Sequence, residues 1–313
     1  MGILNRQGLS SGMELDKSCI AFIGLGEAAE GIISGWGRQR KTQIQAFDIK
    51  QKTASEKDEI TDRGKKLKIL LKGSLEEMVN GSDIIFSTVT AKNALDVAKE
   101  ASLYLKKGAF FFDLNSCAPS SKQKACEYVQ AAGGRYVDVA VMAPVYQKKN
   151  LVPLLISSVW ADDANSILKK LPMNSRVIKG AIGQASTVKM VRSIMVKGLE
   201  ALTAECALAA VEADVLDEVF TSLSDGHPHF DIFKHSIYNF ERSISHGKRR
   251  AEELKEVSKM LEDLKLANHM SKATAIWQKN IGSLEKTNSM SEIKENFVSF
   301  AKQLSAELRD IKE

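Results

Sequence analysis

Several features that mark secreted, membrane-bound or disulfide-linked proteins are missing from this 313-residue sequence. Its four cysteines show no C-x-x-C pair and no spacing typical of metal ligands, which indicates reduced cytosolic thiols and predicts no metal site. Residues 1–17 contain no apolar core of signal-peptide length, and no apolar run is long enough to cross a bilayer. We therefore expect a cytoplasmic protein without a membrane partner.

A large excess of charge of one sign is missing as well. The 44 basic and 39 acidic residues give a formal net charge of +5, and both signs alternate along the chain. A protein that binds nucleic acid usually concentrates positive charge in an arm or on one face. This balance argues against a nucleic-acid partner and favours a small anionic ligand.

Short apolar runs alternate with helical segments in the first half of the chain. Cys19–Ile23 has no polar alternation, which predicts a first strand buried on both faces. Further strands are expected at Ile44–Phe47, Lys68–Leu71, Asp83–Phe86, Phe110–Phe112, Tyr136–Val139, Leu154–Ser158 and Arg176–Ile178. Helices lie between them, for example at Lys92–Leu105 and Ser120–Ala132. The pattern predicts an α/β fold with a doubly wound, mostly parallel sheet of the Rossmann type.

The second half of the chain is helical in pattern. Ser186–Asp214 has no proline and apolar residues at helical spacing, so we expect a helix of about 40 Å there. Further helices are expected at Val215–Leu223, Asp231–Glu241, Lys248–Leu264, Met270–Trp277 and Ser291–Arg309, with one strong break at Asp225–Pro228. The domains are therefore predicted as an N-terminal extension over 1–17, an α/β domain over 18–180 and an all-α domain over 181–313. The long helix and its apolar stripes exceed what one small domain covers, which predicts a homodimer.

A glycine-rich turn directly after the first strand is the strongest single motif. In this G-x-G-x-x-A pattern, Gly24 allows the tight turn, Gly26 lets the backbone approach a pyrophosphate, and Ala29 lets the helix pack closely on the strand. A strand before it, a helix after it and an acidic residue at the end of the next strand complete the context of a dinucleotide site. The predicted cofactor-binding residues are Gly24, Leu25, Gly26, Glu27, Ala28, Asp48, Thr88, Val89 and Thr90.

Asp48 bears on which nicotinamide cofactor is bound. A carboxylate there accepts hydrogen bonds from the adenosine ribose and repels a 2′-phosphate, which favours NAD. Lys50 and Lys52 follow closely and weaken that preference, so NADP stays an alternative. The other interpretation of Asp48, a helix N-cap, is less favoured because the residues after it are not clearly helical.

Two further segments are candidates for the chemistry. Asp113–Pro119 follows the fifth strand, at the end where open α/β sheets bind ligands, and its Ser116 and backbone N–H groups suit a carboxylate. An ordinary cap before a helix explains the same residues equally well. In Gly183–Ser193, Lys189 stands among apolar residues, and partial burial would lower its pKa enough for proton transfer near neutral pH. By pattern alone, a lysine whose stem lies along a packed helix is the better explanation.

With these three motifs in chain order, the sequence resembles the β-hydroxyacid dehydrogenase family, which includes 3-hydroxyisobutyrate and 6-phosphogluconate dehydrogenases. Gly24–Gly26 looks like its cofactor loop, Asp113–Pro119 like its D-x-[ST]-[ST]-x-x-P substrate motif, and Gly183–Ser193 like its G-x-G-x-x-x-K-x-x-N-N catalytic motif. The resemblance covers about residues 18–280. It implies that Lys189 is the catalytic acid/base and that Ser116 contacts the substrate.

The sequence departs from the family pattern at several positions. Asn115 stands where Ser or Thr is usual, Ala185 replaces a glycine, and Arg192 and Ser193 replace the two asparagines. The family's Gly-Gly substrate loop is here Met142-Ala143-Pro144, and Pro144 has no N–H to donate. These departures favour an unusual substrate. The run Lys189–Ser193, followed by Lys197–Leu202, looks more like the poorly characterised phosphogluconate-dehydrogenase-like branch of the family. The remaining substrate-binding candidates are Asn115, Met142, Ala143, Arg192, Ser193 and Arg249, the last from a basic run that a solvated charge cluster explains equally well.

These residues predict an NAD(P)-dependent dehydrogenase in which a hydride passes between a nicotinamide and a small anionic hydroxy acid. Lys189 would accept the hydroxyl proton and return it in the reverse direction. Two alternatives stay open. One is an imine reductase on the same fold, and the other is a catalytically silent NAD(P)-binding protein, which the substituted asparagine positions and Pro144 permit.

Overall fold

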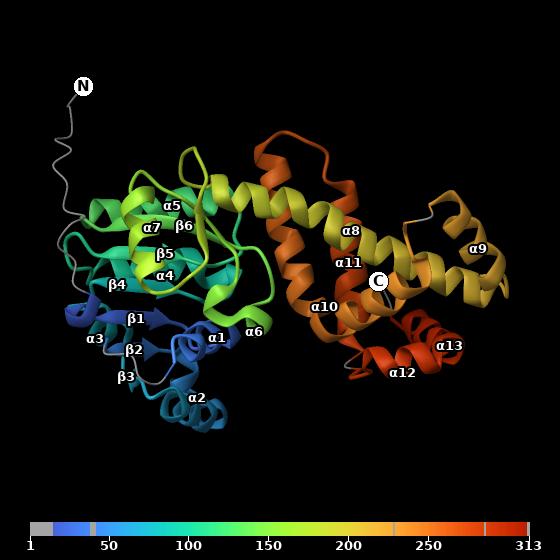
Figure 1. Cartoon of the computed structure of the whole chain (residues 1–313), viewed down its shortest axis with the longest axis horizontal. Coiled ribbons are helices and arrows are strands. Elements are labelled where there is room, and N and C mark those ends of the chain that lie inside the picture. Colours follow the sequence, from blue (N-terminus) through green and yellow to red (C-terminus); the bar gives the residue numbers. More distant parts are fainter. Residues whose placement is uncertain (1–14, 38–41, 228, 285, 312–313) are drawn as a thin grey trace. The chain divides into compact units, whose positions relative to one another are not determined.

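The protein is described from a computed structural model over residues 15–37, 42–227, 229–284 and 286–311. The chain divides into two compact units, residues 1–189 (unit 1) and 190–313 (unit 2) (Figure 1). Most of the predicted N-terminal extension, residues 1–14, and Pro228 of the predicted break lie outside the described residues. Along the described ranges, no helix combines the length and the apolar character needed to cross a membrane.

Unit 1 contains a single eight-stranded sheet in the order β3-β2-β1-β4-β5-β6-β7-β8. Its strands are β1 (Ile20–Ile23), β2 (Ile44–Phe47), β3 (Leu70–Leu71), β4 (Ile84–Ser87), β5 (Phe110–Asp113), β6 (Arg135–Val141), β7 (Leu154–Ser157) and β8 (Ser175–Val177). Neighbours pair in parallel except β6 and β7, which are antiparallel. The predicted mostly parallel sheet is confirmed, and each strand expected from an apolar run is present.

Both faces of this sheet are covered, which explains why its strands lack polar alternation. In β1, Ile20 and Phe22 belong to one apolar layer, whereas Ala21 and Ile23 belong to the layer on the opposite face. The first layer is completed by α1 (Glu27–Gly35), α2 (Ala54–Leu67), α6 (Val145–Lys148) and α7 (Ala161–Lys170). The opposite layer is completed by α3 (Leu75–Val79), α4 (Ala94–Ser102) and α5 (Pro119–Ala131). This is the doubly wound arrangement that the alternation of strands and helices predicts.

Strands β1 to β6 all pair in parallel, so their carboxyl ends lie at one edge of the sheet. Phe22, Phe86 and Phe112 are register partners on β1, β4 and β5, and their rings stack with centroids 5.0 and 5.1 Å apart. This aromatic layer fixes the alignment of the three central strands. The segments that follow them, including those after Ile23, Ser87 and Asp113, therefore leave the sheet side by side. Short 3-10 helices complete the unit at Leu15–Lys17 (η1), Ile49–Lys52 (η2), Ala91–Asn93 (η3) and Lys149–Leu151 (η4).

Unit 2 is entirely helical over its described residues, as predicted. Its helices are α8 (Gln184–Glu212), which begins in unit 1, then α9 (Leu216–Gly226), α10 (Ile232–Asp263), α11 (His269–Ser283), α12 (Met290–Glu295) and α13 (Phe297–Arg309). Side chains from every one of these helices form its apolar core. Phe297 stands within that core with its ring 6.2 Å from that of Phe220 and 6.0 Å from that of Phe240.

Two helix boundaries in unit 2 differ from the expectation. The predicted break between Glu241 and Lys248 is wrong, because α10 is one helix of 32 residues. Gly247 inside it marks a close helix crossing, since a Cβ there would lie 2.3 Å from the backbone oxygen of Gln278 on α11. The single helix expected at Ser291–Arg309 is instead divided at Asn296, where φ of −125° and ψ of 33° leave the helical region.

Candidate active site

The turn after β1 requires glycine at its first position. Gly24 has φ of +85°, and its N–H donates to the Phe47 backbone oxygen at 2.8 Å. A Cβ on Gly24 would lie 2.8 Å from the backbone oxygen of Thr88, which follows β4. The Thr88 hydroxyl in turn donates to the Gly24 oxygen at 2.7 Å. The glycine-rich turn therefore contacts the backbone of Thr88 directly, and only a residue without a side chain permits this approach at position 24.

Gly26 presents open space at the start of α1. A Cβ on Gly26 would meet no atom within 4 Å, and as the N-cap residue it offers the helix no side-chain hydrogen bond. Ala29 is fully buried on the strand side, Ala28 is half-buried, and Glu27 is exposed. The first N–H groups of α1 and the open side of Gly26 thus suit the pyrophosphate of a dinucleotide. The residues of this turn fit the predicted cofactor.

Both carboxylate oxygens of Asp48 accept hydrogen bonds from the backbone. Oδ2 accepts from the Leu25 N–H at 2.7 Å, and Oδ1 accepts from the Lys50 N–H at 3.0 Å. The expectation that the residues after Asp48 are not helical is wrong, because Asp48 is the N-cap of η2. The helix propensities of Ile49–Lys52 do not reveal this short 3-10 helix, because the Asp48 side chain stabilises its start by accepting the Lys50 N–H. The Asp48 carboxylate therefore holds the glycine-rich turn to the residues that follow β2.

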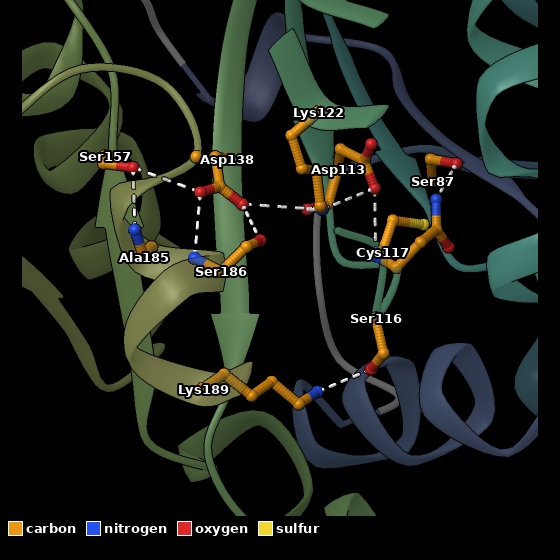
Figure 2. Close-up of polar contacts among 12 residues, drawn as sticks. Ser87, Asp113, Ser116, Cys117, Lys122, Asp138, Ser157, Ala185, Ser186 and Lys189 are labelled. Carbon is orange, nitrogen blue, oxygen red and sulfur yellow. Dashed lines mark hydrogen bonds and ion pairs between the residues drawn. The ribbon is translucent and has the colours of Figure 1, made fainter. Parts of the chain in front are cut away.

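Lys189 and Ser116 meet, although they are 73 residues apart in sequence. The Lys189 ammonium donates to the Ser116 hydroxyl oxygen at 2.6 Å (Figure 2). Both side chains are half-buried. Ser116 comes from the turn after β5, and Lys189 comes from the second turn of α8. The two segments that pattern alone left ambiguous are therefore brought together within unit 1.

Asn115 links this pair to the end of β4, next to the glycine-rich turn. Its side-chain NH₂ donates to the Ser87 hydroxyl at the end of β4 at 2.9 Å, and its backbone N–H donates to Asp113 Oδ1 at 2.9 Å. Within the described part of the chain, its Oδ1 is buried and accepts no hydrogen bond. A buried acceptor in this position suits a ligand that brings a hydroxyl or amide hydrogen. Contacts thus run continuously from Gly24 through Thr88, Ser87 and Asn115 to the Ser116–Lys189 pair.

A buried charged cluster lies under the same loops, and the sequence analysis missed it. Lys122 on α5 is fully buried, and its ammonium lies 2.9 Å from Asp113 Oδ1 and 3.5 Å from Asp138 Oδ1. Burial alone would lower the pKa of Lys122, but the two carboxylates outweigh it and raise that pKa. The Tyr136 hydroxyl donates to Asp113 Oδ2 at 2.6 Å, and burial raises its pKa well above the usual range. One available signal was Asp138, a charged residue inside an apolar strand.

The other predicted substrate residues are placed as follows. Met142 and Ala143 are half-buried after β6, and the Met142 N–H already donates to the Pro153 oxygen at 2.9 Å. Arg192, Ser193 and Arg249 belong to unit 2, so the Gly183–Ser193 motif is divided between the units. There Arg192 is exposed, the Ser193 hydroxyl lies 3.5 Å from the Lys197 ammonium, and the exposed Arg249 lies 3.7 Å from Glu253.

Two family descriptions match successive parts of the chain. Residues 19–115 match "NADP oxidoreductase coenzyme F420-dependent", and residues 210–281 match a domain of unknown function, DUF1932. The first match covers the glycine-rich turn and the strands around it. It agrees with a nicotinamide-binding domain and does not distinguish NAD from NADP.

Similar proteins match the chain over nearly its full length. An uncharacterised 28.5 kDa protein of Methanothermus fervidus is 30% identical over 266 residues, which cover 84% of this chain and 98% of that protein. A conserved hypothetical protein from Sinorhizobium meliloti is 29% identical with a TM-score of 0.74, over 93% of this chain and 96% of that one. The 3-hydroxyisobutyrate dehydrogenase of Mycobacterium tuberculosis, solved with L-serine, is 14% identical with a TM-score of 0.68, over 90% and 99%.

The fold is that of the NAD(P)-dependent 3-hydroxyacid dehydrogenases. The chain belongs to one family with the archaeal 28.5 kDa protein. Its two matched domains occur in 3-hydroxyisobutyrate dehydrogenase-like proteins. The resemblance stated from the three sequence motifs is thereby confirmed.

Proposed function

We propose that this protein transfers a hydride between a nicotinamide cofactor and a small anionic hydroxy acid, with Lys189 as the general acid/base. The observation that carries the proposal is the 2.6 Å contact between the Lys189 ammonium and Ser116. It lies at the end of the series of contacts that starts at the cofactor turn. An amine beside a hydroxyl-bearing loop at this end of a Rossmann sheet suits proton transfer coupled to alcohol oxidation.

Each residue has a distinct part in the proposed chemistry. Gly24, Gly26 and the start of α1 would hold the cofactor, which when bound accepts or supplies the hydride. Lys189 in its neutral form takes the proton of the substrate hydroxyl and returns it in the reverse direction. Ser116 orients that hydroxyl or the neighbouring acid group, and the unpartnered Oδ1 of Asn115 accepts one further hydrogen. The substrate roles of Met142, Ala143, Arg192, Ser193 and Arg249 stay predictions.

We further propose NAD as the preferred cofactor, with NADP as the alternative. Asp48 supports NAD because its carboxylate is held at the glycine-rich turn, where a 2′-phosphate would meet negative charge. Lys50 does not offset this charge freely, because its ammonium lies 2.7 Å from Glu56. A hydrogen bond from Lys50 to Glu56, aided by the charge of that carboxylate, also raises the lysine pKa. For the substrate class, support comes from the Mycobacterium tuberculosis enzyme, which was solved with L-serine, itself a 3-hydroxy acid.

The proposal is tested with Lys189→Ala. A panel of hydroxy acids that includes 3-hydroxyisobutyrate and L-serine is screened with NAD and NADP by the absorbance of the reduced cofactor. Loss of the proton-transfer group is expected to lower kcat by about 10²- to 10⁴-fold with the cofactor Kd unchanged. Lys124→Ala, an exposed lysine on α5, is the control. Unchanged turnover in Lys189→Ala would remove Lys189 as the acid/base. Cofactor binding without turnover of any substrate would favour the silent NAD(P)-binding alternative.

A homodimer and a cytoplasmic location are kept as proposals. On α8, Val191, Met195, Leu199 and Leu202 are exposed by 44–63% and repeat at helical spacing along one face. We propose that a second copy of the chain covers this stripe, and sedimentation at micromolar concentration gives the oligomeric state. The cytoplasmic proposal is supported by the four cysteines, none of which is joined to another in a disulfide.

A further inference from the structure

The cluster around Lys122 has no direct part in the proposed proton transfer. Its ammonium donates to the backbone oxygen of Asp113 at 2.7 Å and lies between the carboxylates of Asp113 and Asp138. The two aspartates are register partners on β5 and β6, so their Cα atoms are adjacent across one strand pair. Burying three charges is usually no more stable than apolar packing of the same volume. The cluster therefore calls for an explanation other than stability.

Asp138 holds the beginning of the helix that carries Lys189. Its Oδ1 accepts from the Ser186 hydroxyl at 2.6 Å, and its Oδ2 accepts from the Ser186 backbone N–H at 3.0 Å. Oδ2 also accepts from the Ser157 hydroxyl at 3.2 Å, whose oxygen accepts from the Ala185 N–H at 3.1 Å. Figure 2 shows Asp138 between this group and Lys122. The carboxylate thus accepts the Ser186 N–H directly and supports the Ser157 hydroxyl that accepts the Ala185 N–H, both in the first turn of α8, one turn before Lys189.

Asp113 holds the turn that carries Ser116. Its Oδ1 accepts from the Asn115 N–H at 2.9 Å, which closes a tight turn directly before Ser116. The contact of Lys122 with the Asp113 backbone oxygen fixes the same turn from the other side. One ammonium therefore contacts both anchors, that of the Ser116 turn and that of the Lys189 helix.

We propose that Lys122 is a positioning residue that sets the approach of Lys189 to Ser116 by joining Asp113 to Asp138. This inference rests on the proposed function of Lys189. The physical reason is charge: strands in a sheet lie about 4.8 Å apart, and two carboxylates facing each other at that spacing in a dry interior repel strongly without a cation between them. Removal of the cation is expected to separate the two anchors and loosen the first turn of α8.

The test uses Lys122→Met, which keeps the length of the side chain and removes its charge. Lys124→Met is the matched control, since it makes the same change two residues along α5 at an exposed position. Hydrogen exchange of residues 184–189 is expected to become at least about tenfold faster in Lys122→Met only. The kcat for 3-hydroxyisobutyrate or L-serine is expected to fall by about 100-fold, with the cofactor Kd unchanged. In the double variant Lys122→Met/Asp138→Asn, the loss of one positive charge is balanced by the loss of one negative charge, so the two strands no longer carry facing carboxylates. This variant is expected to restore slow exchange and much of kcat.

The outcomes separate this inference from the proposed function. Wild-type exchange at residues 184–189 in Lys122→Met overturns the inference whatever Lys189→Ala does. Fast exchange with normal turnover, while Lys189→Ala is inactive, overturns it as well, because the cluster would then be structural only. If Lys189→Ala is fully active, the proposed function fails, and the exchange of residues 184–189 decides the role of Lys122 by itself. If Lys122→Met does not fold, the double variant must fold and regain slow exchange, and its failure to do so overturns the inference.

Discussion

Among the residues that the structure describes, each unit buries one lysine, and the two lysines differ in the direction of their pKa shift. In unit 1, Lys122 is fully buried and its pKa lies above the ordinary value of 10.5. In unit 2, Lys197 on α8 is 6% exposed and its pKa lies below that value. Burial lowers the pKa of any lysine, so burial cannot account for the difference.

The difference lies in the charges around each ammonium. Lys122 stands between two carboxylates, which together outweigh its loss of water. For Lys197, burial dominates, and its contact with Glu253 at 2.7 Å is opposed by the positive charges of Arg250 and Arg249. The pKa of a buried lysine therefore rises only where nearby carboxylates outweigh both burial and competing cations. By the same reasoning, removal of the Lys122 charge should cost much stability, whereas removal of the Lys197 charge beside Glu253, Arg249 and Arg250 should cost little.

The largest predicted effect contrasts the removal of each lysine. Lys122→Met leaves two buried carboxylates without a cation and is expected to lower the free energy of unfolding by about 3–5 kcal/mol. Lys197→Met removes a charge that burial already disfavours and leaves Glu253 near Arg249, so we expect a change within about 1 kcal/mol. Urea titrations followed by circular dichroism measure both, with Lys124→Met as the control. Equal losses of unfolding free energy in Lys122→Met and Lys197→Met would contradict the proposed difference between the two lysines.

A smaller effect is expected from the carboxylate of unit 2. Glu253→Gln removes the negative partner of Lys197, so the pKa of Lys197 falls further and the free energy of unfolding drops by about 1–3 kcal/mol. Glu252→Gln changes the adjacent, exposed residue of α10 and serves as the matched control. The lysine pKa is followed by NMR titration of the labelled side-chain amine. A rise in that pKa would contradict the assignment of Glu253 as its partner.

The smallest predicted effect is a difference in alkaline stability. Because the folded-state pKa of Lys122 is raised, its contribution is complete below the unfolded value of 10.5 and is lost as pH rises through the folded pKa. The pKa of Lys197 is lowered, so its burial penalty holds below that folded pKa and disappears as pH rises toward 10.5. As pH rises above 10.5, the stability of wild type relative to Lys122→Met should fall. As pH rises toward 10.5 from below, the stability of wild type relative to Lys197→Met should rise. If both stability differences changed in the same direction as pH rises, the opposite pKa shifts of Lys122 and Lys197 would be refuted.

Fold class followed from local pattern because both faces of the sheet are buried. Apolar runs such as Ile44–Phe47 become strands at the predicted residues, and the glycine-rich turn lies where its spacing places it. Helix continuity was less predictable. Gly247 stands in the interruption predicted between Glu241 and Lys248, but it lies inside α10, where its lack of a side chain lets Gly282 of α11 approach closely. Only the packing partner distinguishes a glycine that ends a helix from one that admits a neighbour.

The sequence by itself determined the order of strands and helices, the cofactor turn and the three family motifs, since each depends on residues close together in the chain. Tertiary structure alone decided that Lys189 reaches Ser116 and that Lys122 joins Asp113 to Asp138. Those contacts depend on which strands are adjacent, on their register and on where α8 starts. Periodicity reports which side of an element is buried, whereas it carries no information on which distant charge will face it.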